Sequence, residues 1–178
     1  MINAMIDLET LGKVPGCPIV SIGAVEFDPA TGELGRQFYE RVDLDGHVTG
    51  TADASTIKWW LKQSEEARNA LTAPGGVYHT EELLSAFHQW LPTDVKVWGN
   101  GATFDISILE HAYRAAGWQD IPWAHWNVRD CRTVADLGKQ ISVTRDQCPR
   151  HGVHHNALDD AIYQAQWVSH IWQALVCR

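Results

Sequence analysis

Residues 2–8 read Ile-Asn-Ala-Met-Ile-Asp-Leu, a largely apolar stretch that predicts a buried strand, and two carboxylates, Asp7 and Glu9, stand at its end. Residues i and i+2 of a strand point to the same face, so Asp7 and Glu9 should lie side by side. Two such carboxylates repel each other unless divalent cations lie between them. For an isolated pair, a solvated strand end is the more common explanation, so the rest of the chain has to decide.

The segments that follow this stretch favour an α/β fold. Residues 18–27 and 34–42 are rich in strand formers, and the Pro- and Gly-containing segment 28–32 between them is typical of a hairpin turn. Helical periodicity then takes over and alternates with short strands. Helices are expected at about 55–71, 80–91, 105–116 and 156–175, strands at 95–98 and 126–131, and a polar loop before the last helix. This order predicts one layered domain over residues 1–178, with a mixed sheet flanked by helices.

The charge balance restricts the classes of partner. The chain has 178 residues with 22 Asp and Glu against 14 Lys and Arg, a net charge of −8. An acidic chain is a poor candidate for coating duplex DNA or binding membranes through bulk positive charge. This acidic charge does not exclude a protein that binds a short piece of nucleic acid through metal ions.

Targeting and redox signals point to the cytoplasm. The N-terminus has no basic region, no apolar run approaches the length of a membrane span, and no CxxC motif occurs. Free thiols in a reducing compartment are therefore expected, with no membrane partner. The four cysteines are Cys17, Cys131, Cys148 and Cys177.

Two further motifs carry candidate chemistry. Asn100-Gly-Ala-Thr-Phe-Asp105 follows the strand at 95–98, so Asp105 should project near the carboxyl edge of the sheet. His155-Asn-Ala-Leu-Asp-Asp160 opens the last helix and combines a candidate general base with a candidate metal ligand. Each motif alone is better explained as an ordinary helix N-terminus, where Asn and Asp are favoured.

The three motifs together are more specific. In this order, D-x-E, N-x-x-x-F-D and H-x-x-x-x-D resemble the exonuclease motifs of the DEDDh superfamily over nearly the whole chain, from Asp7 to Asp160. The His distinguishes this branch from the one with Tyr-x-x-x-Asp. The segment Ser55-Thr-Ile-Lys-Trp-Trp60 further resembles a narrower group, which includes the Rv2179c-like exoribonuclease domain and phage exodeoxyribonuclease A.

The resemblance implies a fold and a reaction. The fold would be ribonuclease H-like, with a mixed five-stranded sheet of order 3-2-1-4-5 whose second strand is antiparallel. The reaction would remove nucleoside 5′-monophosphates from the 3′ end of single-stranded DNA or RNA, or of an overhang. Two Mg²⁺ or Mn²⁺ ions would serve as cofactors. The matching positions are His155 for the general base and Asp7, Glu9, Asp105 and Asp160 for the metal ligands.

The doubled residues in the last motif leave alternatives. His154 with Asp159 has the same spacing as His155 with Asp160, and helix geometry does not choose between them. Family members commonly read H-x-A-L-x-D, which favours His155 and Asp160 and places His155 just before the helix or in its frayed first turn. A competing zinc site would crowd its ligands into eight residues without a second Cys pair. Its ligands would be Cys148, His151, His154 and His155.

Substrate contacts are also implied by the resemblance. Thr10 and Leu11 would line the pocket for the terminal nucleotide, Asn100 would hold the penultimate one, and Trp59 or Trp60 could stack on a base. A candidate track for the phosphate backbone, equally readable as a solvated loop, is a group of basic residues in 129–150. These are Arg129, Arg132, Lys139, Arg145 and Arg150.

Rival functions remain at this level. A ribonuclease H-like endonuclease is disfavoured by the H-x-x-x-x-D motif. A non-catalytic nucleic-acid-binding or interaction module would carry the carboxylates as vestiges, although all five chemical positions are filled. The residues do not choose between DNA and RNA, and they leave open a homodimer, as in several relatives, and a phage or prophage origin.

Overall fold

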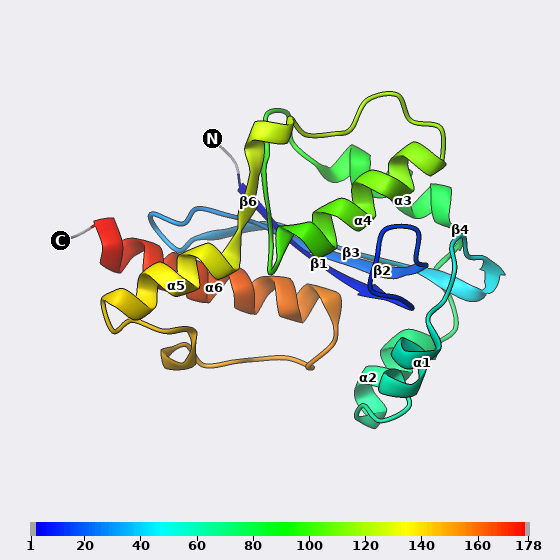
Figure 1. Cartoon of the computed structure of the whole chain (residues 1–178), viewed down its shortest axis with the longest axis horizontal. Coiled ribbons are helices and arrows are strands. Elements are labelled where there is room, and N and C mark those ends of the chain that lie inside the picture. The colour runs from blue at the N-terminus through cyan, green and yellow to red at the C-terminus, as the bar shows by residue number, and fades with distance from the viewer. Residues whose placement is uncertain (1–2, 177–178) are drawn as a thin grey trace.

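The computed structural model describes residues 3–176 and shows a mixed sheet between two layers of helices (Figure 1). The strands are β1 (Asn3–Thr10), β2 (Ile19–Phe27), β3 (Leu34–His47), β4 (Val77–His79), β5 (Lys96–Gly99) and β6 (Val128–Asp130). The helices are α1 (Ala54–Trp60), α2 (Glu65–Thr72), α3 (Thr80–Trp90), α4 (Ala102–Ala115), α5 (Cys131–Gln140) and α6 (Ala157–Val176). Two short 3₁₀ helices, η1 (His125–Asn127) and η2 (Arg145–Gln147), lie between them.

The sheet order confirms the expected topology apart from one strand. The order is β4-β3-β2-β1-β5-β6, with β2 antiparallel to β1 and β3, and with β5 and β6 parallel to β1. Without β4, the order β3-β2-β1-β5-β6 is the predicted 3-2-1-4-5 arrangement, in which β5 and β6 are the fourth and fifth strands. The expected count of five strands was wrong because β4 pairs with the end of β3. Three residues are too few to show a two-residue period, so this edge strand has no signature of its own.

Three other expectations need correction. The helix expected at 55–71 is two helices, because the chain turns after Trp60 and Ser64 caps α2 by accepting a bond from the Ala67 amide. The supposed polar loop contains α5, which is capped by Asp130 through the amides of Arg132 and Thr133. Helix α4 begins at Ala102, three residues before the expected start.

Alternation along β1 decides which helices its residues meet. Ala4, Ile6 and Leu8 belong to the hydrophobic cluster under α3 and α4, whereas Met5 belongs to the cluster under α5 and α6. Asp7 and Glu9 continue the odd-numbered series, so both face the α6 side of the sheet. The period of the strand thereby directs both carboxylates toward the N-terminal turn of α6.

A glycine lets α6 approach the sheet at this point. Gly23 on β2 is the direct partner of Asp7 on β1. A Cβ atom at Gly23 would lie 2.1 Å from the backbone carbon of Ala157 and from the backbone nitrogen of Leu158. Only a residue without a side chain therefore permits the first turn of α6 to lie against β2 beside Asp7.

We expect Gly23→Ala to destabilise the protein by about 3 kcal/mol, because the new methyl group meets backbone atoms that cannot rotate away. The start of α6 must shift, so any activity that depends on Asp7 and Asp160 should fall as well. Urea unfolding measures the stability change. Gly35→Ala is the matched control, since its Cβ would lie 3.0 Å from the Glu26 Cβ and 3.1 Å from its carboxylate, a tight contact that is far milder than the 2.1 Å approach to backbone atoms at Gly23. Equal free energies of unfolding for the two variants would contradict the argument.

The remaining global features are simple. Cys17, Cys131 and Cys148 are free thiols, and Cys177 lies outside the described residues. Between residues 3 and 176, no helix combines the length and the apolar character that crossing a membrane would require.

Candidate active site

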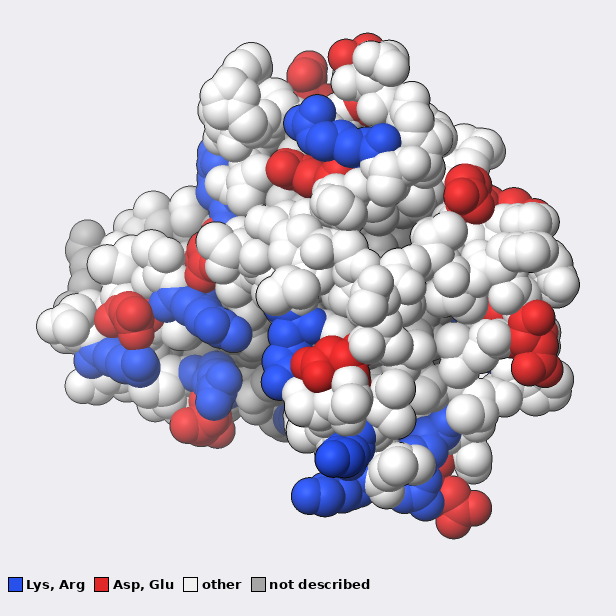
Figure 2. All heavy atoms as spheres, turned by 45° about the vertical axis from the view of Figure 1, so that its right-hand side comes forward, with Lys and Arg blue, Asp and Glu red and all other residues white. Residues whose placement is uncertain are grey.

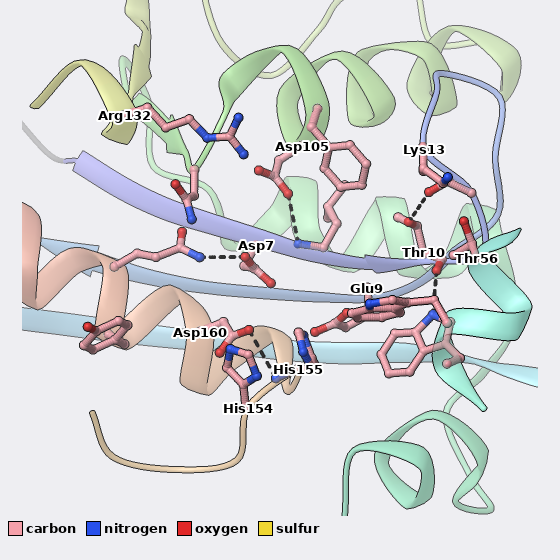
Figure 3. Close-up of a pocket in the computed structure, with 18 of the residues that line it drawn as sticks. Asp7, Glu9, Thr10, Lys13, Thr56, Asp105, Arg132, His154, His155 and Asp160 are labelled. Atoms are coloured by element: carbon pink, nitrogen blue, oxygen red, sulfur yellow. Dashed lines mark hydrogen bonds between the residues drawn. The ribbon is translucent and has the colours of Figure 1, made fainter. Parts of the chain in front are cut away.

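A cavity of about 750 Å³ opens at the carboxyl end of β1, bordered by α1, α4 and α6 (Figure 3). Ligand sites of α/β sheets commonly lie at this edge, where the strand ends and the following helices leave room. The lining contains all five positions expected to carry chemistry. They are Asp7, Glu9, Asp105, His155 and Asp160.

The two carboxylates of β1, Asp7 and Glu9, line the cavity. Asp7 Oδ1 accepts a hydrogen bond of 2.7 Å from the Gln164 side-chain amide on α6. Glu9 is 8% exposed, and its Oε1 atom is buried without a hydrogen-bond partner. Buried carboxylate oxygens normally have partners, so this atom is available as a ligand for a cation.

Asp105 comes from the opposite layer. It lies in the first turn of α4, where its Oδ1 accepts a hydrogen bond of 3.3 Å from the Leu8 amide on β1. In the view of Figure 3, α4 with Asp105 lies above β1, and α6 with Asp160 lies below it. The start of α4 is itself held by Asp130, which accepts a 2.6 Å bond from the Ala102 amide.

The structure separates the two adjacent aspartates at the start of α6. Asp160 is 8% exposed and lines the cavity, whereas the Oδ2 atom of Asp159 accepts a 2.7 Å bond from the Val153 amide outside it. Asp159 also fills the space beside Gly152, where a Cβ atom would lie 2.4 Å from its carboxyl carbon. Asp159 therefore holds the preceding loop, and Asp160 faces Asp7 and Glu9.

The donor set fits divalent cations. Asp7, Glu9 and Asp160 each offer an oxygen, and the three atoms lie within 4.8 Å of one another. Burial raises the pKa of Asp7, with a further increase from the charge of Asp105; burial and the charges of Asp7 and Asp105 likewise raise the pKa of Glu9. Such oxygen clusters suit hard cations such as Mg²⁺, which relieve this repulsion. Within residues 3–176, the groupings that could hold a metal contain neither Cys148 nor His151, so the zinc alternative gains no support.

The two histidines have different surroundings. His155 lies just before α6 with a φ of 66°, and its ring is 4.7 Å from Trp59 and 6.1 Å from Trp60. Its backbone amide donates to Asp160 Oδ2 at 3.2 Å. Burial, then the charges of His154 and Arg150, lower the pKa of His155 to about 4, so its ring is neutral at neutral pH. His154 is exposed at the rim.

Comparison with known proteins decides the family. The family described as the 3′-5′ exoribonuclease Rv2179c-like domain matches residues 2–172. The chain belongs to this family. It is accordingly a nuclease, a hydrolase of the 3′-5′ exonuclease class, as the DEDDh resemblance implied.

Individual relatives agree with this assignment. The chain is 28% identical to an exodeoxyribonuclease of Enterobacteria phage T4, over 84% of this chain and 77% of the relative. The fold matches the nuclease domain of 3′hExo, a DEDDh family member bound to rAMP, with a TM-score of 0.59, 13% identity and coverage of 97% and 92% of the two chains. It also matches exonuclease X in complex with 5′ overhanging duplex DNA, with a TM-score of 0.60, 17% identity and the same coverages. At these identities the two structures show the fold alone.

The expected substrate contacts of the Rv2179c-like domain fall into two groups. Thr10, Asn100 and Trp60 line the cavity, but Leu11 is not among the described residues that do. Trp60 is 4% exposed, and its indole N–H donates to the Thr10 carbonyl at 2.9 Å. Trp59 also lines the cavity and, at 41% exposed, is the more accessible of the two.

Sequence reasoning missed some residues of this site. Gln164 lies one helical turn after Asp160, so the i,i+4 spacing on α6 was the available signal. Of the expected basic track, Arg132, Arg145 and Arg150 line the cavity. The other two lie elsewhere: Arg129 donates to the Trp126 and Val128 carbonyls, and Lys139 pairs with Asp136.

The carboxylate cluster should make the metal-free protein sensitive to pH. Burial raises the pKa of Asp105 from 3.8 to about 7. Between these values Asp7, Glu9 and Asp105, whose pKa values are all raised, bind more protons in the folded protein than in the unfolded chain, whereas His155, whose pKa is lowered, binds fewer. The three carboxyl groups outnumber the histidine, so the free energy of unfolding should fall as the pH rises from about 4 to about 7. Denaturant titrations in EDTA at several pH values measure this loss. Asp105→Asn should weaken the dependence of the free energy of unfolding on pH. An unchanged pH dependence in that variant would refute the contribution of Asp105.

Proposed function

We propose that residues 1–178 form a two-metal-ion 3′-5′ exonuclease domain. It removes nucleoside 5′-monophosphates from the 3′ end of single-stranded DNA or RNA, or of an overhang. The single observation that carries this proposal is the convergence of four carboxylates and His155 in one cavity, from β1, α4 and the start of α6.

The carboxylates would hold two Mg²⁺ or Mn²⁺ ions. Asp7, Glu9 and Asp160 offer clustered oxygens, and Asp105 reaches the same cavity from α4. When bound, such ions supply Lewis-acid charge that activates water and stabilises the leaving oxygen. The four carboxylates contribute a charge of −4 that two divalent ions balance, so a phosphodiester meets a nearly neutral centre.

The protein's own groups would perform the proton transfer and the positioning. His155 accepts the proton of the attacking water, because its ring is neutral at neutral pH and lies beside Asp160. Thr10, Asn100 and the two tryptophans of α1 line the space for the terminal nucleotides. We also propose that Leu11 contacts the terminal nucleotide, because it directly follows Thr10 in the chain.

The surface charge favours a short, single-stranded substrate. Figure 2 shows basic and acidic side chains interspersed over one face, without a continuous basic band. The cavity itself is lined by a few cations, namely Lys13, Arg132, Arg145 and Arg150. Few phosphate contacts mean a short footprint and a weak dependence of affinity on salt.

One assay tests the proposal. Matched DNA and RNA strands labelled at the 5′ end are incubated with the protein and Mg²⁺ or Mn²⁺, with EDTA and Asp7→Ala as controls. A metal-dependent ladder that shortens from the 3′ end supports the proposal, and the faster strand identifies the preferred sugar. If the folded protein cleaves neither strand with either metal, the proposal fails and a non-catalytic binding module becomes the better reading.

A further inference from the structure

Arg150 is one of the cations that line the cavity, and the proposed mechanism gives it no specific partner. It lies in the loop between η2 and α6, and its guanidinium forms an ion pair with Asp160 Oδ1. The same guanidinium stands over the ring of Tyr163, 4.8 Å from its centroid. Its side chain is 30% exposed and lines the cavity. Arg150 is therefore held by two residues that lie one turn apart on α6.

The ion pair occupies a proposed metal ligand. The other oxygen of Asp160 already accepts the His155 amide, so both oxygens of this carboxylate are engaged by the loop. The charge of Arg150 also reaches Asp7, whose pKa it lowers against the larger effect of burial. A guanidinium and a divalent cation at one carboxylate repel each other strongly in a half-buried site. Cation binding and the Arg150–Asp160 pair should therefore compete.

A guanidinium released from Asp160 needs another anion. Arginine offers a planar fork of donors that matches two oxygens of a phosphate group. Under the proposed function, the substrate phosphates are the anions that enter this cavity. The loop can allow such a change without displacing His155, because Asp159 anchors Val153 between the two residues.

We propose that Arg150 is a substrate-binding residue that exchanges one anion for another. It neutralises Asp160 while divalent cations are absent, and it binds a phosphate oxygen of the 3′-terminal nucleotide once cations occupy Asp160. This inference rests on the proposed function. It assigns to Arg150 a role in phosphate recognition and in the affinity of the site for metal.

Two titrations test the exchange without requiring turnover. The first adds Mn²⁺ to the metal-free protein, and the second adds AMP or dAMP to the Mn²⁺-saturated protein, both in a calorimeter. In Arg150→Ala, Mn²⁺ should bind about 5-fold tighter, because no competing guanidinium has to be displaced. The nucleoside monophosphates should bind about 10-fold weaker, because a charge-assisted hydrogen bond is lost.

Two further variants make the result specific. Arg150→Lys keeps the charge without the planar fork, so it should stay close to the wild type for Mn²⁺ and bind the monophosphates more weakly. Arg114→Gln removes one exposed positive charge from α4 and should change neither affinity. Melting curves in EDTA confirm that each variant is folded.

The outcomes separate this proposal from the function on which it rests. Unchanged or weaker Mn²⁺ binding by Arg150→Ala would overturn the competition, and unchanged monophosphate binding would overturn the phosphate contact. Either result leaves a wild-type protein that binds metal and degrades strands. If the wild type binds no Mn²⁺ at millimolar concentration, the two-metal function fails first and the exchange fails with it.

Discussion

Asp7→Asn should lower the rate of 3′-5′ degradation by at least about 1,000-fold while leaving the protein folded. The amide keeps the shape and can still accept the hydrogen bond from Gln164, but it loses the charge that would hold a cation. Loss of a metal ligand removes several kcal/mol of transition-state stabilisation, and 1,000-fold corresponds to about 4 kcal/mol. Initial rates on a 5′-labelled strand at saturating Mn²⁺ measure the effect.

The same substitution should raise the free energy of unfolding in EDTA. Burial and the neighbouring charge of Asp105 raise the pKa of Asp7, so its ionised form opposes folding at neutral pH. A neutral amide removes that opposition. An activity loss combined with a stability gain is the signature of a functional cluster, because a structural residue would show losses in both.

Asp136→Asn is the matched control for Asp7→Asn. Asp136 is an exposed carboxylate on α5, with a side chain that is 74% accessible and pairs with Lys139. Its replacement should change the rate by less than twofold and the stability by less than about 0.5 kcal/mol. Substantial remaining activity in Asp7→Asn would argue that β1 holds no catalytic cation.

His155→Ala should lower kcat by about 100- to 10,000-fold, the usual contribution of a general base. The ring lies beside Trp59 and near Asp160, and burial keeps it neutral at neutral pH. The carboxylates remain, so addition of Mn²⁺ should raise the melting temperature of this variant as much as that of the wild type. Single-turnover rates and melting curves together separate the loss of a base from the loss of a metal.

His154→Ala provides the discriminating comparison. His154 packs against His155 with a ring separation of 3.9 Å, but it is exposed at the rim of the cavity. Its removal should lower kcat by less than tenfold. A larger loss in His154→Ala than in His155→Ala would reassign the general base to the first histidine of the pair.

The features that could be predicted from the sequence depend on local periods and short spacings. The two-residue period of β1 places Asp7 and Glu9 on one face, and the order of strand and helix signals matches the observed sheet apart from β4. The motif spacings also name five positions that the structure brings into one cavity. Helix α5 was not predicted, because its start depends on the Asp130 side chain, which caps the amides of Arg132 and Thr133. The polar composition of this segment does not reveal that contact.

The substrate contacts were less predictable than the carboxylates. Trp59 and Trp60 are adjacent, and their sequence context does not indicate which one is buried. The structure buries Trp60, whose indole bonds to the Thr10 carbonyl fifty positions away in the chain, and this leaves Trp59 as the more exposed of the two tryptophans that line the cavity. A contact of that range has no local signature.

The sequence by itself therefore determined the family motifs, the order of the central strands and the face of β1 that bears charge, because these depend on neighbouring residues. Only the tertiary structure decided which aspartate at the start of α6 faces the cavity. Both flank the apolar stripe of that helix at similar angles. The close approach at Gly23 and the bond from Val153 to Asp159 turn Asp160 toward Asp7, and the same packing pairs Arg150 with Asp160.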